Sequence, residues 1–143
     1  MSAQDYKAFL TSLRTKFPDE SFLIVRFGDH QPYISSKAIE PGRSFEDVSR
    51  SIMERDPRYF KTYYAIDGVN FCPADLSSAL NHLDAPYLPL VILEAAGLPL
   101  DRTFAEQKSI LQRCGGSFYD CKDGAEARRF NRLLIDAGLI KGM

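Results

Sequence analysis

The feature that most constrains the fold is an unbroken apolar run, Phe22–Val25, which closes with Arg26-Phe27 and is cut by Gly28. A strand that is apolar at consecutive positions is typical of a sheet covered on both faces. Ahead of it, an amphipathic helix is expected over residues 3–17, because aromatic and leucine side chains recur there at helical spacing. A helix, a short turn and a covered strand are the ingredients of an α/β layer fold. We therefore expect an α/β chain in which helices flank a sheet of few strands.

The rest of the chain predicts further elements of both kinds. Ser44 can cap a helix that runs to about Met53. Residues 60–66 are rich in aromatic and β-branched residues and predict a second strand, with a turn at Asp67-Gly68 and a short return arm over residues 69–71. More helices are expected over residues 76–83, from Pro86 or Pro89 to Gly97, over 103–113 behind a Thr103/Glu106 capping box, and over 124–137. No repeat or linker divides the chain, so residues 1–143 are expected to form one domain.

Composition narrows the class of protein. The chain has 143 residues, of which 45% are hydrophobic and 26% charged, and its net charge is −1. A chain of this size buries about two thirds of its unfolded surface. Proteins that bind nucleic acid or anionic membranes usually carry a basic surplus, which is missing here. The longest apolar stretch, residues 87–100, falls short of the ~20 residues that a membrane span needs. We expect a soluble chain without an export signal and without nucleic-acid binding.

The three cysteines do not indicate a disulfide framework. Their number is odd and no pair has CxxC spacing. Cys114 and Cys121 flank residues 115–118 and could meet if that loop reverses the chain. Reduced and mostly buried thiols are nevertheless the expectation for these two residues and for Cys72.

The residues that follow the apolar run could hold a metal. Gly28 allows the chain to turn, so that the carboxylate of Asp29 and the imidazole of His30 could reach one ion. An oxygen and a nitrogen donor together suit Zn²⁺ or Mn²⁺ better than Ca²⁺. Ligands in open α/β sheets bind beyond the carboxyl ends of the strands, where this pair lies. Two ligands do not complete a site, however, and the other histidine, His82, is expected at a helix surface.

The tract Phe22–Pro32 (FLIVRFGDHQP) resembles the second metal-binding motif of the alkaline phosphatase and sulfatase superfamily. The nearest likeness is to lipoteichoic acid synthases and related phosphoglycerol and phosphoethanolamine transferases. Residues 61–66 look like the strand that follows the metal loop in this family. Residues 83–98 are similar to its next helix, and residues 5–10 match the helix before the motif. Order and spacing agree over residues ~3–113.

The resemblance implies that Asp29 and His30 are ligands of a catalytic divalent metal, Mn²⁺ or Zn²⁺. Family members complete this site with an acidic residue and a Thr, Ser or Cys nucleophile from an N-terminal half. Cys72-Pro73 does not fit the cysteine that sulfatases mature, because no arginine follows at the required place. The chain then corresponds to the C-terminal part of a sulfatase-like catalytic domain. It is expected to hold no catalytic residue of its own and to be inactive alone, with its substrate unknown.

Two alternatives stay open beside an enzyme portion. The chain could be a non-enzymatic interaction module that keeps this fold, or a small metal-binding protein that takes ligands from a second copy. A sheet of few strands has an open edge, so a homodimer with two-fold symmetry, formed by edge pairing or face packing, is expected. Its other possible partner is an N-terminal catalytic half on a separate or longer chain. The sequence of the chain alone predicts a cytoplasmic protein. The enzymes that it resembles are instead anchored in a membrane, with a catalytic domain outside the cytoplasm.

The remaining polar residues favour structural roles. Arg26 is a charge within an apolar strand, and burying it without a partner would be costly. An ion pair with a carboxylate is therefore expected for it. The basic group Arg55, Arg58 and Lys61 is interpreted as a solvated face.

Overall fold

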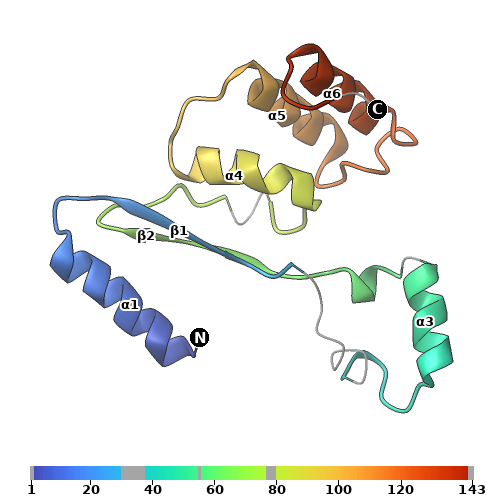
Figure 1. Cartoon of the computed structure of the whole chain (residues 1–143), viewed down its shortest axis with the longest axis horizontal. Coiled ribbons are helices and arrows are strands. Elements are labelled where there is room, and N and C mark those ends of the chain that lie inside the picture. Colours follow the sequence, from blue (N-terminus) through green and yellow to red (C-terminus); the bar gives the residue numbers. More distant parts are fainter. Residues whose placement is uncertain (1, 30–37, 55, 77–79, 142–143) are drawn as a thin grey trace. The chain divides into compact units, whose positions relative to one another are not determined.

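A computed structural model of the chain describes residues 2–29, 38–54, 56–76 and 80–141 (Figure 1). The chain divides into two compact units, Ile24–Asp67 and the combination of Met1–Leu23 with Gly68–Met143. Several helices and one small sheet make up the described residues, so the expected α/β class with few strands is confirmed. In this part of the chain, no helix combines the length and the apolar character needed to cross a membrane.

The sheet consists of two antiparallel strands, β1 (Phe22–Phe27) and β2 (Tyr64–Val69). The bounds of β1 agree with those predicted from its apolar run. The backbone N–H of Gly28 donates to the carbonyl oxygen of Tyr63 at 3.0 Å, which extends the pairing one residue beyond each strand. This bond fixes which backbone groups of β1 point toward β2.

The second strand begins later than predicted, and the predicted turn at Asp67-Gly68 is wrong. Both residues lie inside β2, and the chain turns instead at Asn70, whose φ is +62°. The side-chain amide of Asn70 donates to the carbonyl oxygens of Phe17, at 2.7 Å, and Glu20, at 2.6 Å. These distant contacts stabilise a left-handed backbone that asparagine tolerates better than most residues. The chain therefore turns at Asn70, where hydrogen bonds to residues about fifty positions earlier hold the backbone, and not at the local turn signal of Asp67-Gly68.

The two helices in the first half of the chain agree with the sequence. Helix α1 (Ala3–Lys16) begins with a capping box in which Ser2 Oγ accepts from the N–H of Asp5, at 3.1 Å, while Asp5 accepts from the N–H of Ser2. Helix α3 (Phe45–Met53) begins after Ser44, whose hydroxyl accepts from the N–H of Asp47. Each cap satisfies a backbone donor that the first turn of a helix leaves unpaired.

The second half of the chain forms a short 3₁₀ helix, η2 (Ala85–Tyr87), and helices α4 (Leu88–Ala95), α5 (Arg102–Cys114) and α6 (Ala125–Asp136). Figure 1 shows α5 beside α6. Gly97 and Gly138 follow α4 and α6 with positive φ, as predicted for helix stops. Another short 3₁₀ helix, η1 (Pro57–Tyr59), precedes β2.

Two predictions about these helices need correction. The helix expected over residues 76–83 is not formed by residues 80–83, while residues 77–79 lie outside the described part of the chain. The cap of α5 is Asp101 rather than Thr103. One carboxylate oxygen of Asp101 accepts from the backbone N–H groups of Thr103, at 2.8 Å, and Phe104, at 2.9 Å. A carboxylate that reaches two donors is a better cap than the hydroxyl two residues later.

The core of the larger unit centres on Phe118, which lies in the loop between α5 and α6. Its ring meets the rings of Tyr87, at a centroid distance of 5.3 Å, and Phe130, at 5.8 Å, both edge to face. Leu90 and Ile110, both fully buried, complete this cluster. The loop residue therefore joins η2, α4, α5 and α6 into one packed group.

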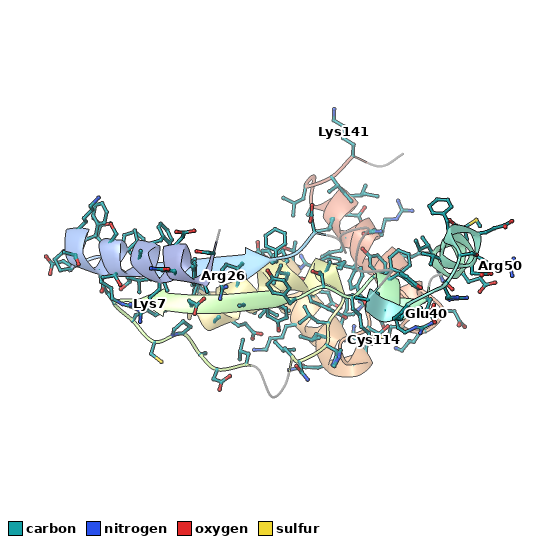
Figure 2. All side chains as sticks on the ribbon, turned by 90° about the horizontal axis from the view of Figure 1, so that it is seen from below. Lys7, Arg26, Glu40, Arg50, Cys114 and Lys141 are labelled. Atoms are coloured by element: carbon teal, nitrogen blue, oxygen red, sulfur yellow. A yellow bond between two sulfur atoms is a disulfide. The ribbon has the colours of Figure 1, made fainter. Side chains whose placement is uncertain are left out.

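The same loop contains a disulfide bond between Cys114 and Cys121, whose Cα atoms are 5.7 Å apart. Cys114 ends α5 (Figure 2). The expectation of three reduced thiols is therefore wrong for this pair. The loop does reverse the chain, because α5 and α6 pack against each other and bring its two ends together. Cys72 is a free, exposed cysteine.

Replacing Phe118 with alanine should lower the free energy of unfolding by about 3–5 kcal/mol, the usual cost of emptying a buried phenylalanine site. Urea denaturation followed by circular dichroism measures this change. Tyr119→Ala is the matched control, because its neighbouring side chain is 59% exposed. The control should cost only about 1 kcal/mol, from the lost ring contact. Equal losses in the two variants would contradict a core centred on Phe118.

Removing the disulfide with Cys114→Ser and Cys121→Ser should lower the free energy of unfolding by about 2–3 kcal/mol, because the unfolded chain gains freedom when the short loop opens. Cys72→Ser, which removes the free thiol, is the control and should leave stability unchanged within ~0.5 kcal/mol. A double variant as stable as the control would show that the bond adds nothing to the other contacts of the loop.

Candidate functional site

The candidate metal ligands follow the carboxyl end of β1. Asp29 lies in an exposed bend one residue beyond Gly28, and His30 lies outside the described residues. The carboxylate of Asp29 therefore leaves the sheet at the end where ligands of α/β proteins are usually bound. This placement agrees with the strand-then-ligand order predicted from the sequence.

Gly28 is needed at this junction for the close approach of a neighbouring segment. Its φ is not positive, unlike that of Gly42 in the same unit. A Cβ atom at position 28 would instead overlap the side-chain hydroxyl of Thr62, on the segment that leads into β2. Glycine lets the two backbones pair at this point, since any side chain would force Thr62 away. The junction before Asp29 is consequently held by backbone pairing and contact.

Within the described residues, no group of three or more His, Cys, Asp or Glu side chains gathers around a position that could hold a metal. His82 is exposed, as predicted, but lies in a non-helical segment. Asp29 and His30 supply one carboxylate and one imidazole, donors that suit Zn²⁺ or Mn²⁺. These donors fit half of a metal site, and the remaining ligands would have to come from elsewhere.

Arg26 forms the ion pair expected for it. Its guanidinium donates to the carboxylate of Asp67 on β2 at 3.2 Å, and both side chains are partly exposed. Figure 2 places Arg26 on β1. The interaction joins the two strands through their side chains on one face. It gives Arg26 a structural role.

In the basic group predicted at Arg55, Arg58 and Lys61, the charge of Arg58 is neutralised by two carboxylates. Its guanidinium contacts the carboxylates of Asp56, at 2.6 Å, and Glu40, at 2.9 Å. Hydrogen bonds from Arg58 lower the pKa of Asp56 to about 2. Glu40 also accepts from the hydroxyl of Tyr59 at 2.9 Å and pairs with Arg43. Arg55 lies outside the described residues. These contacts tie the segments around α3 together and leave Arg58 poorly suited to hold a phosphate.

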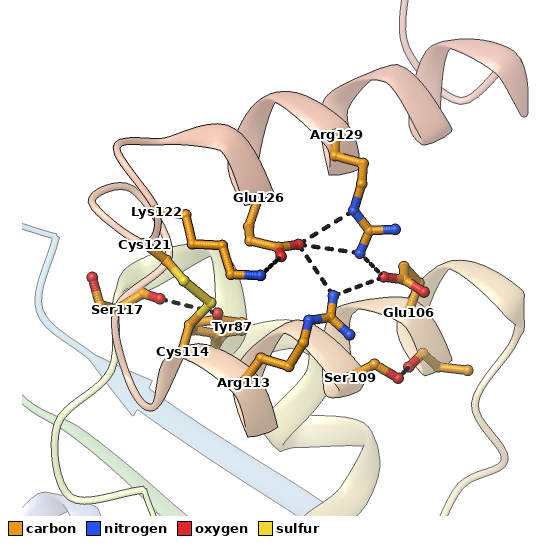
Figure 3. Close-up of polar contacts among 11 residues, drawn as sticks. Tyr87, Glu106, Ser109, Arg113, Cys114, Ser117, Cys121, Lys122, Glu126 and Arg129 are labelled. Atoms are coloured by element: carbon orange, nitrogen blue, oxygen red, sulfur yellow. Dashed lines mark hydrogen bonds and ion pairs between the residues drawn. A yellow bond between two sulfur atoms is a disulfide. The ribbon is translucent and has the colours of Figure 1, made fainter.

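The densest charge cluster was not predicted from the sequence. Glu126 on α6 is 6% exposed, and three cations surround its carboxylate: Lys122 at 2.9 Å, Arg113 at 3.1 Å and Arg129 at 3.1 Å (Figure 3). Both arginines also contact Glu106 on α5. The hydrogen bond from Lys122, followed by that from Arg113, lowers the pKa of Glu126 to about 2.

This Glu126 cluster connects α5 to α6 and has the character of a structural ion network. Each carboxylate is paired, so neither is poised to accept or donate a proton near neutral pH. Arg129 follows Glu126 by three residues on the predicted helix, a spacing typical of helical neighbours, whereas Lys122 lies in the turn before α6. The contributions of Arg113 and Glu106 depend on how α5 packs against α6, which spacing alone does not reveal.

A second unpredicted contact positions the loop that carries Phe118. One carboxylate oxygen of Asp84 accepts from the backbone N–H groups of Phe118, at 2.6 Å, and Tyr119, at 3.0 Å. The N–H of Asp84 donates to the carbonyl oxygen of Gly116 at 2.7 Å. A Cβ at position 116 would overlap the carbonyl of His82. Residues 82–84, just ahead of η2, thus bind this loop.

Comparisons with family models, curated proteins and solved structures gave no match to this chain.

Replacing Glu126 with glutamine should destabilise the protein most above pH 5. The pKa of this carboxyl is about 2 in the folded state and about 4.3 when unfolded. Its stabilising contribution is therefore complete above the unfolded pKa and disappears as pH falls toward 2. Urea midpoints measured from pH 7 to pH 2 should differ between wild type and Glu126→Gln at pH 7 and converge in acid. A difference that stays constant over this range would contradict the ion network.

Proposed function

We propose that this chain is the C-terminal portion of a sulfatase-like, metal-dependent phosphotransferase or hydrolase. Asp29 and His30 are two ligands of its divalent metal, and the other ligands and the nucleophile come from a further catalytic portion. On this proposal the chain alone does not turn over substrate. The observation that carries the proposal is the junction at Gly28, which delivers Asp29 directly beyond the carboxyl end of β1.

The geometry of this junction supports a ligand role for Asp29. Gly28 donates to Tyr63 at 3.0 Å, and its missing side chain leaves room for Thr62. The backbone is thus fixed on one side of Asp29 by regular pairing. A metal ligand benefits from such a support, because less freedom is lost when the ion binds.

The order of elements also supports the proposal. Helix α1 precedes β1, the strand β2 follows the candidate ligands, and α4 ends at Ala95 shortly before Gly97. These elements occupy the segments on which the resemblance to lipoteichoic acid synthase-like transferases rests. This support comes from the order of helices and strands along the chain. It does not come from the sheet, because two strands do not define a layered sulfatase-like sheet.

A divalent metal at this site would stabilise negative charge on a phosphoryl group and activate a nucleophile. The chain's own contribution is to hold Asp29 at the strand end. His30 would add an imidazole donor from the next position in the sequence. The substrate class stays open among phosphoglycerol, phosphoethanolamine and related esters.

The Cys114–Cys121 disulfide favours an extracytoplasmic location for this portion. Such bonds persist in oxidising compartments and are rare where glutathione and thioredoxin keep thiols reduced. This finding fits the location of the resembling enzymes better than the cytoplasmic location expected from the chain alone.

A non-enzymatic interaction module is the second candidate function. The observation that favours it is the sheet, which has only two strands within the described residues. A strand with unpaired backbone groups is a surface on which another chain can pair.

Adding Mn²⁺ should broaden the imidazole proton signals of His30 in NMR spectra before those of His82. The paramagnetic ion affects nuclei near its binding site, and the chain has only these two histidines. Binding through two ligands should be weak, with a dissociation constant on the order of millimolar. Asp29→Ala should remove most of the selective broadening, because it removes the neighbouring carboxylate ligand.

His82→Gln assigns the two signals and serves as the matched control, since His82 is exposed and should not affect binding. Equal broadening of both histidines, or selective broadening that survives Asp29→Ala, would overturn the assignment of Asp29 and His30.

A further inference from the structure

Three consecutive residues just before α6 have a left-handed backbone. Lys122 has a φ of +50°, Asp123 of +55° and Gly124 of +75°. Glycine adopts such angles freely and aspartate does so occasionally as a single residue, but a run of them costs energy at each residue that has a side chain. Backbone strain of this kind persists only where surrounding contacts impose it. This left-handed turn, residues 122–124, must therefore be held by its neighbours.

The disulfide bond lies at the start of the left-handed turn. It ties Cys121 to Cys114 at the end of α5, so the chain cannot move away from that helix (Figure 3). Two backbone bonds then close the turn. The N–H of Gly124 donates to the carbonyl oxygen of Cys121 at 3.1 Å, and the N–H of Ala125 donates to that of Lys122 at 3.0 Å. Both bonds depend on the position that the disulfide gives to Cys121.

Polar contacts hold the end of the left-handed turn. The Nζ of Lys122 contacts the carboxylate of Glu126 at 2.9 Å. The N–H and the guanidinium of Arg128 donate to the carbonyl oxygens of Gly124, at 3.1 Å, and Asp123, at 3.0 Å. Water competes for every one of these groups, so each bond adds only a small net stabilisation. The disulfide, which is covalent, is therefore the strongest constraint on the turn.

The first half of the same loop is held without the disulfide. The carboxylate of Asp84 accepts from the N–H groups of Phe118 and Tyr119. The ring of Phe118 is also buried in the core. Opening the disulfide leaves these contacts in place, so the segment that it releases is limited to residues 120–124.

We propose that the Cys114–Cys121 disulfide is a redox switch, and that its reduction by a protein dithiol releases residues 120–124 while the core stays packed. A thiolate of the dithiol attacks one sulfur and forms a mixed disulfide, and the other cysteine leaves as a thiolate that takes up a proton. The second thiol of the dithiol then attacks the mixed disulfide. The dithiol ends as a disulfide, and both cysteines end as thiols. Cys114 and Cys121 are both partly exposed, which gives a dithiol access.

The strain in the left-handed turn favours the reduced state. The turn is imposed while Cys121 is tied to α5, so reduction lets Lys122 and Asp123 return to ordinary backbone angles. Lys122 then loses its fixed position beside Glu126. The switch therefore changes the charges at the start of α6 without opening the aromatic core.

The switch is independent of the proposed metal ligands. It involves residues 114–126 of the larger unit, whereas Asp29 and His30 belong to the smaller unit. A negative result for the switch therefore leaves the metal assignment untouched. In an oxidising compartment the bond persists unless a dedicated reductant opens it, which is why the switch is assigned to a protein dithiol.

Amide exchange measured by NMR tests how far the release extends. When dithiothreitol reduces the wild-type protein, the N–H groups of Gly124 and Ala125 should exchange about tenfold faster or more, because their acceptors lie in the released segment. The N–H groups of Phe118 and Tyr119 are the internal control and should keep their protection, since Asp84 still holds them. Faster exchange at all four groups, or at none of them, would overturn the proposal.

An equilibrium with glutathione tests whether the bond and the strained turn are coupled. Asp123→Gly relieves strain only in the oxidised state, so it should raise the equilibrium constant for disulfide formation by about fivefold. Asp120→Gly is the matched control, because it adds the same backbone freedom at a residue whose φ is not positive, and it should not raise the constant. Both variants carry Cys72→Ser, so the thiols counted belong to the one bond. Equal constants in the two variants would contradict the switch.

Discussion

Phe118 belongs to neither a helix nor a strand, yet the packing of the larger unit depends on where its ring is held. Asp84 fixes the backbone of Phe118 and Tyr119 through two N–H groups, and the Cys114–Cys121 disulfide closes the same loop. The hydroxyl of Tyr87 adds a bond to the carbonyl of Ser117 at 3.3 Å. With the loop held in this way, the ring contacts residues from η2 and α6. The Glu126 cluster then joins α5 to α6 on the polar side.

Elements whose limits are set by their own residues could be predicted from the sequence. Strand β1 and helices α1, α3 and α6 have strong patterns and local caps or stops, so the bounds agree within a residue or two. Predictions failed where a distant group decided the outcome. The pair Asp67-Gly68 is typical of a turn. Both residues nevertheless belong to β2, because the strand pairs with β1 and the turn forms at Asn70, which is held by distant contacts. The disulfide was weighed as a minor alternative, because only the packing of α5 against α6 brings its ends together.

The candidate site shows the same division between local and distant causes. The sequence correctly placed Asp29 at the end of a strand, because the apolar run and the glycine are both local signals. It did not reveal that Gly28 also permits close approach, since the close neighbour is Thr62 from a segment more than thirty residues away. The Glu126 cluster was missed for a related cause. Arg129 is a helical neighbour of Glu126, whereas Lys122 comes from the turn before α6 and Arg113 reaches Glu126 from α5.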